Sequence, residues 1–393
     1  MSIFKKDNKV DWFLLLLVGF CAISIYGTAL QISLHVILPF VFVVVGIRNA
    51  KKLSPNNSLK LYLALVFWLG LCSIFAYDAS VANVVMVKIL SGFLCSFMLY
   101  HLAYKEKNVL WIYFIVIASF ISLMIYAKNN IGLVIAESVG ERLQDDVINA
   151  NMFAYSLFYA SFALYCVFKK FVSKLFFIEL LFVFCLLGIS VWLSLMTASR
   201  QVIMLQVPFL LSLFAVGKFK LKPANIVMLL LFFGLLVYVG FPVFEHYTSG
   251  SLLAERSEVS FAEDSRSTIL MEALKCGLEN PIFGVGPGNF VLVNKYHIIA
   301  HNNFAELFTN GGFIALLLYV VMVAENLITQ WKRFRSTSDS FFLYHLLFQF
   351  FFIVDNMLYV QISSLWLMGF YFISVGHSDS YYSRIRICSK RNL

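Results

Sequence analysis

Three side chains in this sequence have the chemistry to act on a phosphorylated substrate: Arg200, Arg266 and His301. Two guanidinium groups suit a diphosphate, because each can make paired, charge-assisted hydrogen bonds to phosphate oxygens. A neutral imidazole can remove the proton from an attacking hydroxyl group. If the fold brings the three together over a site at membrane level, they predict transfer of a group from a diphosphate-linked lipid to a hydroxyl.

The composition says what kind of scaffold must position these residues. The chain has 393 residues, of which 61% are hydrophobic and 13% charged, whereas soluble domains carry about 25% charged residues. The apolar runs are continuous over about 20 residues, which is typical of membrane helices and not of barrel strands. The sequence therefore predicts an all-α integral membrane protein, with residues 1–393 forming a single polytopic domain.

About twelve membrane spans follow from the hydropathy pattern. An even number of spans places both termini on the same side of the membrane. The predicted spans are 11–28, 30–47, 59–77, 84–103, 109–126, 152–168, 175–196, 201–216, 224–244, 303–324, 341–357 and 360–376.

The basic residues give the orientation of these spans. Most of the 30 lysine and arginine residues lie in short clusters at the N-terminus, in alternate loops and in the C-terminal tail. Such clusters mark the cytoplasmic side, so we expect both termini to be cytoplasmic. Clusters at span ends are topology signals, so the net charge of +9 does not indicate a nucleic-acid partner.

The opposite, external side contains one long segment, residues 245–302, between the ninth and tenth spans. Loops longer than about 15 residues tend to be functional or disordered. Within this one, the apolar spacing predicts an amphipathic helix over 266–278, ended by Asn280 and Pro281. Two smaller external features are the loop 127–151, which contains Arg142, and the turn that ends in Arg200.

The external segment also contains a glycine-rich stretch, Gly284-Val285-Gly286-Pro287-Gly288. It does not predict a nucleotide site, because no strand of a βαβ unit precedes it and Pro287 has no N–H to donate. We expect a tight, irregular turn near the membrane, whose backbone N–H groups can still face an anion.

Each candidate residue also has a simpler interpretation. Arg200 can be an interfacial arginine that extends to the membrane surface, although an arginine on the external side favours function. Arg266 alone resembles a solvated loop arginine. A metal site at His301 is disfavoured, because no second ligand follows four residues later and His297 lies in a predicted loop. Of the seven cysteines, most lie in apolar spans and are expected to be buried free thiols.

Four ordered motifs on the external side resemble the O-antigen ligase and polymerase superfamily. The resemblance covers roughly residues 137–324, and the predicted topology extends it to the whole chain. The motifs are Arg142-Leu143 with Asn151-Met152-Phe153-Ala154, then Thr197-Ala198-Ser199-Arg200, then Arg266 with the run from Glu279 to Phe290, and finally the run from His301 to Gly312.

The resemblance implies a metal-independent, cofactor-free, inverting glycosyltransferase with a GT-C type membrane fold. Its donor would be a glycan on undecaprenyl diphosphate. By analogy, Arg200 and Arg266 would hold the diphosphate as leaving group, and His301 would activate the acceptor hydroxyl. We expect the substrate-binding residues to be Arg142, Asn289, Asn302, Asn303 and Glu306.

Three functions remain open from the sequence. The first is an O-antigen ligase of lipopolysaccharide biosynthesis, which uses lipid A–core as acceptor. The second is an O-antigen or exopolysaccharide polymerase, which uses an undecaprenyl-linked repeat. A flippase or transporter is disfavoured, because the predicted spans are nearly free of charges apart from Lys88. For either enzyme we expect the bacterial inner membrane, with the active site on the periplasmic side.

Overall fold

The computed structural model describes residues 10–12, 15, 19, 56–133, 150–172, 176–199, 202–216, 265–357 and 365–391, and these residues contain no strand. This part of the chain is all-α, as predicted. Its elements are α3 (Asn57–Cys72), η3 (Ser73–Phe75), α4 (Ala79–Tyr104), α5 (Glu106–Asn130), α6 (Ala150–Phe171), α7 (Phe176–Thr197), the π-helix η5 (Val202–Gln206), α8 (Val207–Val216), α11 (Ser265–Glu279), α12 (Phe290–Val293), α13 (Asn303–Thr337), α14 (Ser340–Asn356) and α15 (Leu365–Arg391).

Six helices among the described residues are long and apolar enough to cross a membrane. Each coincides with a predicted span, and shorter apolar helices occupy Val202–Val216 and Ser340–Asn356. The predicted spans 30–47 and 224–244 lie outside the described residues, and so does most of the span 11–28, so the count of twelve stays a prediction. The six are Asn57–Phe75, Ala79–Tyr104, Lys107–Asn130, Ala150–Phe171, Phe177–Thr197 and Asn303–Thr337.

Two segments that were predicted as a cytoplasmic loop and a cytoplasmic tail are helical. The tenth span was expected to end near residue 324, yet α13 continues to Thr337, and only a short turn with Ser338 at φ 55° separates it from α14. The predicted tail after residue 376 belongs to α15, which continues to Arg391. Hydropathy marks where a helix leaves the membrane and not where it ends, and lysine and arginine are good helix formers. Gly311 and Gly312 break α13, and at 1.5 Å per residue its continuous part from Phe313 to Thr337 is about 37 Å long, beyond a hydrocarbon core of about 30 Å.

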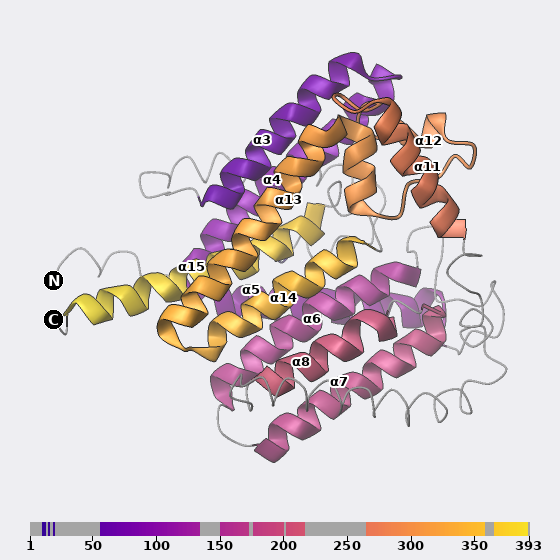
Figure 1. The fold of residues 1–393 in the computed structure, drawn as a ribbon. Helices are drawn as coiled ribbons and strands as arrows, with labels where there is room; N and C mark the ends of the chain where they lie inside the picture. The colour runs from indigo at the N-terminus through magenta and orange to yellow at the C-terminus, as the bar shows by residue number, and fades with distance from the viewer. Residues whose placement is uncertain are drawn as a thin grey trace, which may run out of the picture. The chain divides into compact units, whose positions relative to one another are not determined.

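The chain divides into two compact units. The first contains α3, α4, α5 up to Trp111, and α11 to α15, and the second contains α5 from Ile112 together with α6, α7, η5 and α8. In the first unit, α15 packs along α4, and α13 packs against α3, α14 and α11 (Figure 1).

Small residues allow the close contact between α4 and α15. A Cβ atom added to Gly376 would lie 2.4 Å from the Tyr100 carbonyl oxygen, and one on Gly369 would lie 2.6 Å from Leu99. Membrane helices associate through such close backbone approach, because lipid provides no hydrophobic driving force between them.

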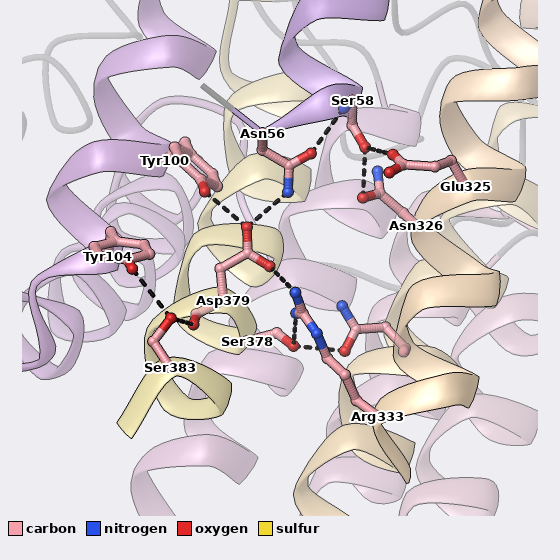
Figure 2. Close-up of polar contacts among 11 residues, drawn as sticks. Asn56, Ser58, Tyr100, Tyr104, Glu325, Asn326, Arg333, Ser378, Asp379 and Ser383 are labelled. Atoms are coloured by element: carbon pink, nitrogen blue, oxygen red, sulfur yellow. Dashed lines mark hydrogen bonds and ion pairs between the residues drawn. The ribbon is translucent and has the colours of Figure 1, made fainter. Parts of the chain in front are cut away.

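A buried carboxylate, Asp379 of α15, joins four parts of the first unit (Figure 2). Its Oδ2 accepts hydrogen bonds from Asn56 Nδ2 at 2.6 Å and from the Tyr100 hydroxyl at 2.7 Å. Its Oδ1 pairs with the guanidinium group of Arg333 on α13. Asn56 in turn caps α3, where its side chain accepts from the Ser58 N–H. We call these residues the Asp379 cluster: Asn56, Tyr100, Arg333 and Asp379.

The second unit has its own core and its own buried ion pair. Leu123, Phe153, Leu193 and Val202 belong to one buried cluster. The carboxylate of Glu179 accepts hydrogen bonds from the Tyr165 hydroxyl at 2.8 Å and from Lys169 Nζ at 3.0 Å.

Candidate functional site

His301 lies in the turn that leads into α13, and its backbone is strained. Its φ of 51° is in the left-handed region, which non-glycine residues adopt rarely, although histidine does so more often than most. Strained backbone of this kind clusters at functional sites, provided that the surrounding structure holds it in place. The side chain is half-buried, so it lies at the surface of the first unit.

Asn302 holds the turn from its C-terminal side. Its side-chain oxygen accepts hydrogen bonds from the N–H groups of Phe304 and Ala305, both at 3.0 Å, and so caps α13. Its Nδ2 donates to the carbonyl of Met357, at the end of α14, at 3.2 Å. The residue after His301 therefore fixes the direction of α13 and connects it to α14. Its neighbour Asn303 is fully buried.

Glu306 holds the turn from the other side. It is buried, and its Oε2 accepts a hydrogen bond from the N–H of Ala300, the residue before His301, at 3.0 Å. Its Oε1 accepts from Asn310 Nδ2 at 3.4 Å. These contacts favour a positioning role for Glu306 over the substrate contact predicted from the sequence.

Helix α11, which begins with Ser265 and Arg266, confirms the amphipathic helix predicted over 266–278. Its buried face joins Ile269 and Ala273 to Phe290, Ala300 and Ala305 in one core. Arg266 is half-buried and lies one turn before Ile269.

This core gives Arg266 and His301 a shared support. Ile269 follows Arg266 by one turn, and Ala300 directly precedes His301. Further along α11, a Cβ atom on Gly277 would lie 2.4 Å from the Phe308 ring, so the helix rests closely on α13. Figure 1 shows α11 and α12 beside the first part of α13.

Three backbone N–H groups of the glycine-rich turn form hydrogen bonds within the protein. Gly284 N–H donates to Asn280 O at 3.0 Å, Val285 N–H to Thr309 O at 2.7 Å, and Gly288 N–H to Asn310 Oδ1 at 3.1 Å. The suggestion that this turn presents N–H groups to an anion is therefore wrong for these three donors. Since Asn310 also contacts Glu306, the turn is connected through two side chains to the backbone beside His301.

A break in α13 accommodates this turn. Gly311 and Gly312 have non-helical dihedral angles, and Gly312 has φ 68°. A Cβ atom on Gly312 would lie 2.2 Å from the Ile282 carbonyl oxygen, so only glycine fits. The Phe313 N–H, released from the helical pattern, donates to Pro281 O at 2.7 Å. Trp68 of α3 donates to Gly311 O at 2.7 Å.

Asn289 joins the turn to the α3–α4 connection. It is fully buried, its Oδ1 accepts from the Asp78 N–H at 2.8 Å, and its Nδ2 donates to the carbonyls of Asp78 and Pro287, both at 3.2 Å. Both ends of the amide are used, which favours a structural role over the substrate binding predicted for it. Asp78, Trp68 and Asn310 were not predictable as partners from the sequence, because each lies in a different element from the group it contacts.

Two titrating groups near the site have altered pKa values. Burial raises the pKa of the Cys276 thiol to about 11, so it stays protonated at neutral pH and is a poor nucleophile. Hydrogen bonds from the Ser80 hydroxyl and from the N–H groups of Val81 and Ser80 lower the pKa of Asp78, the N-cap of α4.

The second unit brings together two other motif residues. The hydroxyl of Ser199 donates to Asn151 Oδ1 at 3.1 Å, so the start of α6 contacts the turn after α7. Ala198 in this turn has φ 46°, and the π-helix η5 begins at Val202. Both features are frequent at functional sites. Arg142 and Arg200, which were predicted as site residues, lie outside the described residues.

Within the described ranges, no group of three or more histidine, cysteine, aspartate or glutamate residues is arranged to hold a metal ion. His297, four residues before His301, has its Nδ1 3.1 Å from the Val291 carbonyl oxygen.

Fold and site together define a multi-pass, all-α membrane protein in which polar residues surround the start of α13. Residues 180–320 match the family model described as O-antigen ligase. This match supports the resemblance to the O-antigen ligase and polymerase superfamily that the sequence predicts. A search of the curated proteins found no significant match.

Proposed function

We propose that this protein is an O-antigen ligase, which transfers a polysaccharide from undecaprenyl diphosphate to a sugar hydroxyl of lipid A–core. The observation that carries the proposal is the left-handed His301 turn, held by Asn302 and Glu306 inside the segment that matches the family model. Such a turn presents one half-buried imidazole from a fixed backbone, and a general base needs this kind of placement.

In the proposed step, the acceptor hydroxyl attacks the anomeric carbon of the donor sugar from the side opposite the diphosphate. A bond forms between this carbon and the acceptor oxygen, and the bond from the carbon to the diphosphate oxygen breaks. The hydroxyl proton passes to the neutral imidazole of His301. The electron pair of the broken bond leaves with undecaprenyl diphosphate, and the configuration at the anomeric carbon is inverted.

The two arginines bind the leaving group, undecaprenyl diphosphate. Arg266, half-buried at the start of α11, stabilises the negative charge that develops on the diphosphate, and the family resemblance gives Arg200 the same role. Guanidinium groups bind phosphate oxygens in pairs, so the charge is balanced without a metal ion. The energy of the reaction is already stored in the donor, which explains the lack of a nucleotide motif in the sequence.

The alternative function is a polymerase that uses another undecaprenyl-linked repeat as acceptor. The chemical step is the same, and only the acceptor differs. The match to the family model supports both functions equally, so the acceptor is what the experiment must identify.

The test is a deletion strain whose lipopolysaccharide is separated on a gel. A ligase predicts core without polymer, while long polymer accumulates on the lipid carrier. A polymerase predicts core bearing a single repeat. Normal, fully polymerised lipopolysaccharide in the deletion strain would contradict both functions.

A further inference from the structure

A second group of polar side chains lies inside the first unit, away from the His301 turn. It consists of Gln330 on α13, Gln349 on α14 and Ser374 on α15. Gln349 and Ser374 are fully buried, and Gln330 is 1% exposed. We call these three residues the amide layer.

Contacts on either side place Gln349 and Ser374 at the same level. His345 Nε2 lies 3.2 Å from His377 Nδ1, and the ring centroids of Phe352 and Tyr371 are 4.4 Å apart. Gln349 follows His345 by four residues and precedes Phe352 by three. Ser374 lies three residues from both Tyr371 and His377. Residues three or four apart share a helix face, so Gln349 and Ser374 face the same interface.

Gln330 approaches this level from α13. Its Oε1 accepts from the Ser378 hydroxyl at 2.5 Å, and one turn earlier Asn326 Nδ2 donates to the Tyr371 hydroxyl at 2.7 Å. Ser374 lies between Tyr371 and Ser378 on α15. The three helices therefore bring their amide and hydroxyl groups to one layer.

Four atoms of this layer have no hydrogen-bond partner in the part of the chain that the structure describes: Gln330 Nε2, Gln349 Oε1, Gln349 Nε2 and Ser374 Oγ. In the neighbouring Asp379 cluster, Asn56 and Tyr100 donate to one carboxylate oxygen, and Arg333 forms an ion pair with the other (Figure 2). Buried polar groups are nearly always hydrogen-bonded to protein or to ordered water.

We propose that the amide layer is a binding site for internal water, which connects α13, α14 and α15. The unpaired atoms include two amide nitrogens that donate, a carbonyl oxygen that accepts and a hydroxyl that does both. No member of the layer is charged, so the ligand is neutral and both donates and accepts. Water fits this requirement, since buried water typically makes about three hydrogen bonds to such groups.

The test is a double-mutant cycle on the full-length protein in nanodiscs, with the melting temperature as readout. Gln349→Met keeps the length of the side chain and removes both polar atoms, and Ser374→Ala removes one oxygen. If water bridges the two residues, each variant lowers the melting temperature by about 2 °C or more. The double variant then loses less than the sum of the two, because the first change has already broken the bridge. Leu347→Met on the same helix is the matched control and should leave the temperature unchanged.

The opposite result would overturn the proposal. If the layer is dry, the unpaired amide destabilises the fold, and Gln349→Met raises the melting temperature. Strictly additive losses would also contradict a shared bridge. Should Gln349→Met fail to fold, a cryo-electron microscopy map of the wild-type protein bound to an antibody fragment decides. Density peaks within hydrogen-bonding distance of the Gln349 amide and Ser374 Oγ support the site, and featureless space there refutes it.

Discussion

The His301 turn and the Asp379 cluster are both built from polar residues of the first unit, and they use them in opposite ways. In the Asp379 cluster, Asn56, Tyr100 and Arg333 converge on a buried carboxylate that belongs to a regular helix. In the His301 turn, Asn302 and Glu306 hold the backbone on both sides of a half-buried histidine with a left-handed φ.

The difference teaches how to separate structural from functional polar residues in a membrane protein. Side chains that satisfy one another within regular helices stabilise the packing of those helices. Side chains that form hydrogen bonds to a strained backbone hold a neighbouring functional side chain in position. Substitutions in the first arrangement should reduce stability, and substitutions in the second should reduce activity. The following substitutions test this distinction.

The largest effect is expected for Asp379→Ala. It leaves the guanidinium group of Arg333 buried without its carboxylate, and breaking a buried pair costs about 3–5 kcal/mol of folding free energy. The melting temperature and the yield of folded protein should fall sharply. Transfer activity per folded molecule should stay near that of the wild type, and a specific loss of activity would place the cluster in the reaction.

Arg266→Ala should reverse this pattern. Loss of a charge-assisted contact to the diphosphate should lower the transfer rate about 10- to 100-fold, with little change in melting temperature because Arg266 is half-buried. Lys275→Ala is the matched control, since Lys275 lies on the same helix and its ion pair with Glu279 is exposed. Full activity of Arg266→Lys would argue against a paired guanidinium contact.

The loss of stability in Glu306→Ala is expected to lie between those of Asp379→Ala and Arg266→Ala. It leaves the Ala300 N–H and the Asn310 amide without their acceptor, which should cost about 1–3 kcal/mol of folding free energy. The turnover number should fall because His301 loses its support, while the KM for the donor changes little. Glu306→Gln retains an acceptor oxygen and should restore most of the turnover. No rescue by glutamine would show that the charge itself is required.

The smallest effect concerns Asp78, the N-cap of α4. Its pKa is lowered in the folded protein, so its contribution to stability is present above the unfolded value of about 3.9 and is lost as the pH falls through the folded value. Asp78→Asn keeps a capping side chain that does not titrate. The melting temperature of the wild type should therefore fall relative to this variant below about pH 4, and a constant difference would contradict the assignment.

Local patterns predicted the parts of the fold that depend on neighbouring residues. The apolar spacing of residues 266–278 gave α11, because a helix face repeats within a few positions. The Asp379 cluster was not predictable in this way, since Asn56 and Asp379 are 323 positions apart. The extension of α13 was not predictable from hydropathy, because its charged residues lower the hydropathy, although they form a good helix outside the membrane.

The candidate site likewise contains residues that the sequence identified and residues whose contacts it did not predict. His301 and Arg266 were selected by residue type and motif, and the structure connects both to one core. Asn289 was assigned to substrate because it is polar and external, yet both ends of its amide hold backbone groups. Sequence alone does not separate these cases, because the direction of a polar side chain depends on elements that are distant in the chain.

The most direct test compares two histidines of the same loop, His301 and His297. Both have a left-handed φ, of 51° and 53°, so each alanine variant carries the same kind of backbone strain. Glycan transfer to the acceptor is measured with purified protein and a lipid-linked donor. Loss of a general base should lower the rate about 10²- to 10⁴-fold in His301→Ala, while His297→Ala stays close to the wild type. Equal activity of the two variants would contradict the proposed role of His301.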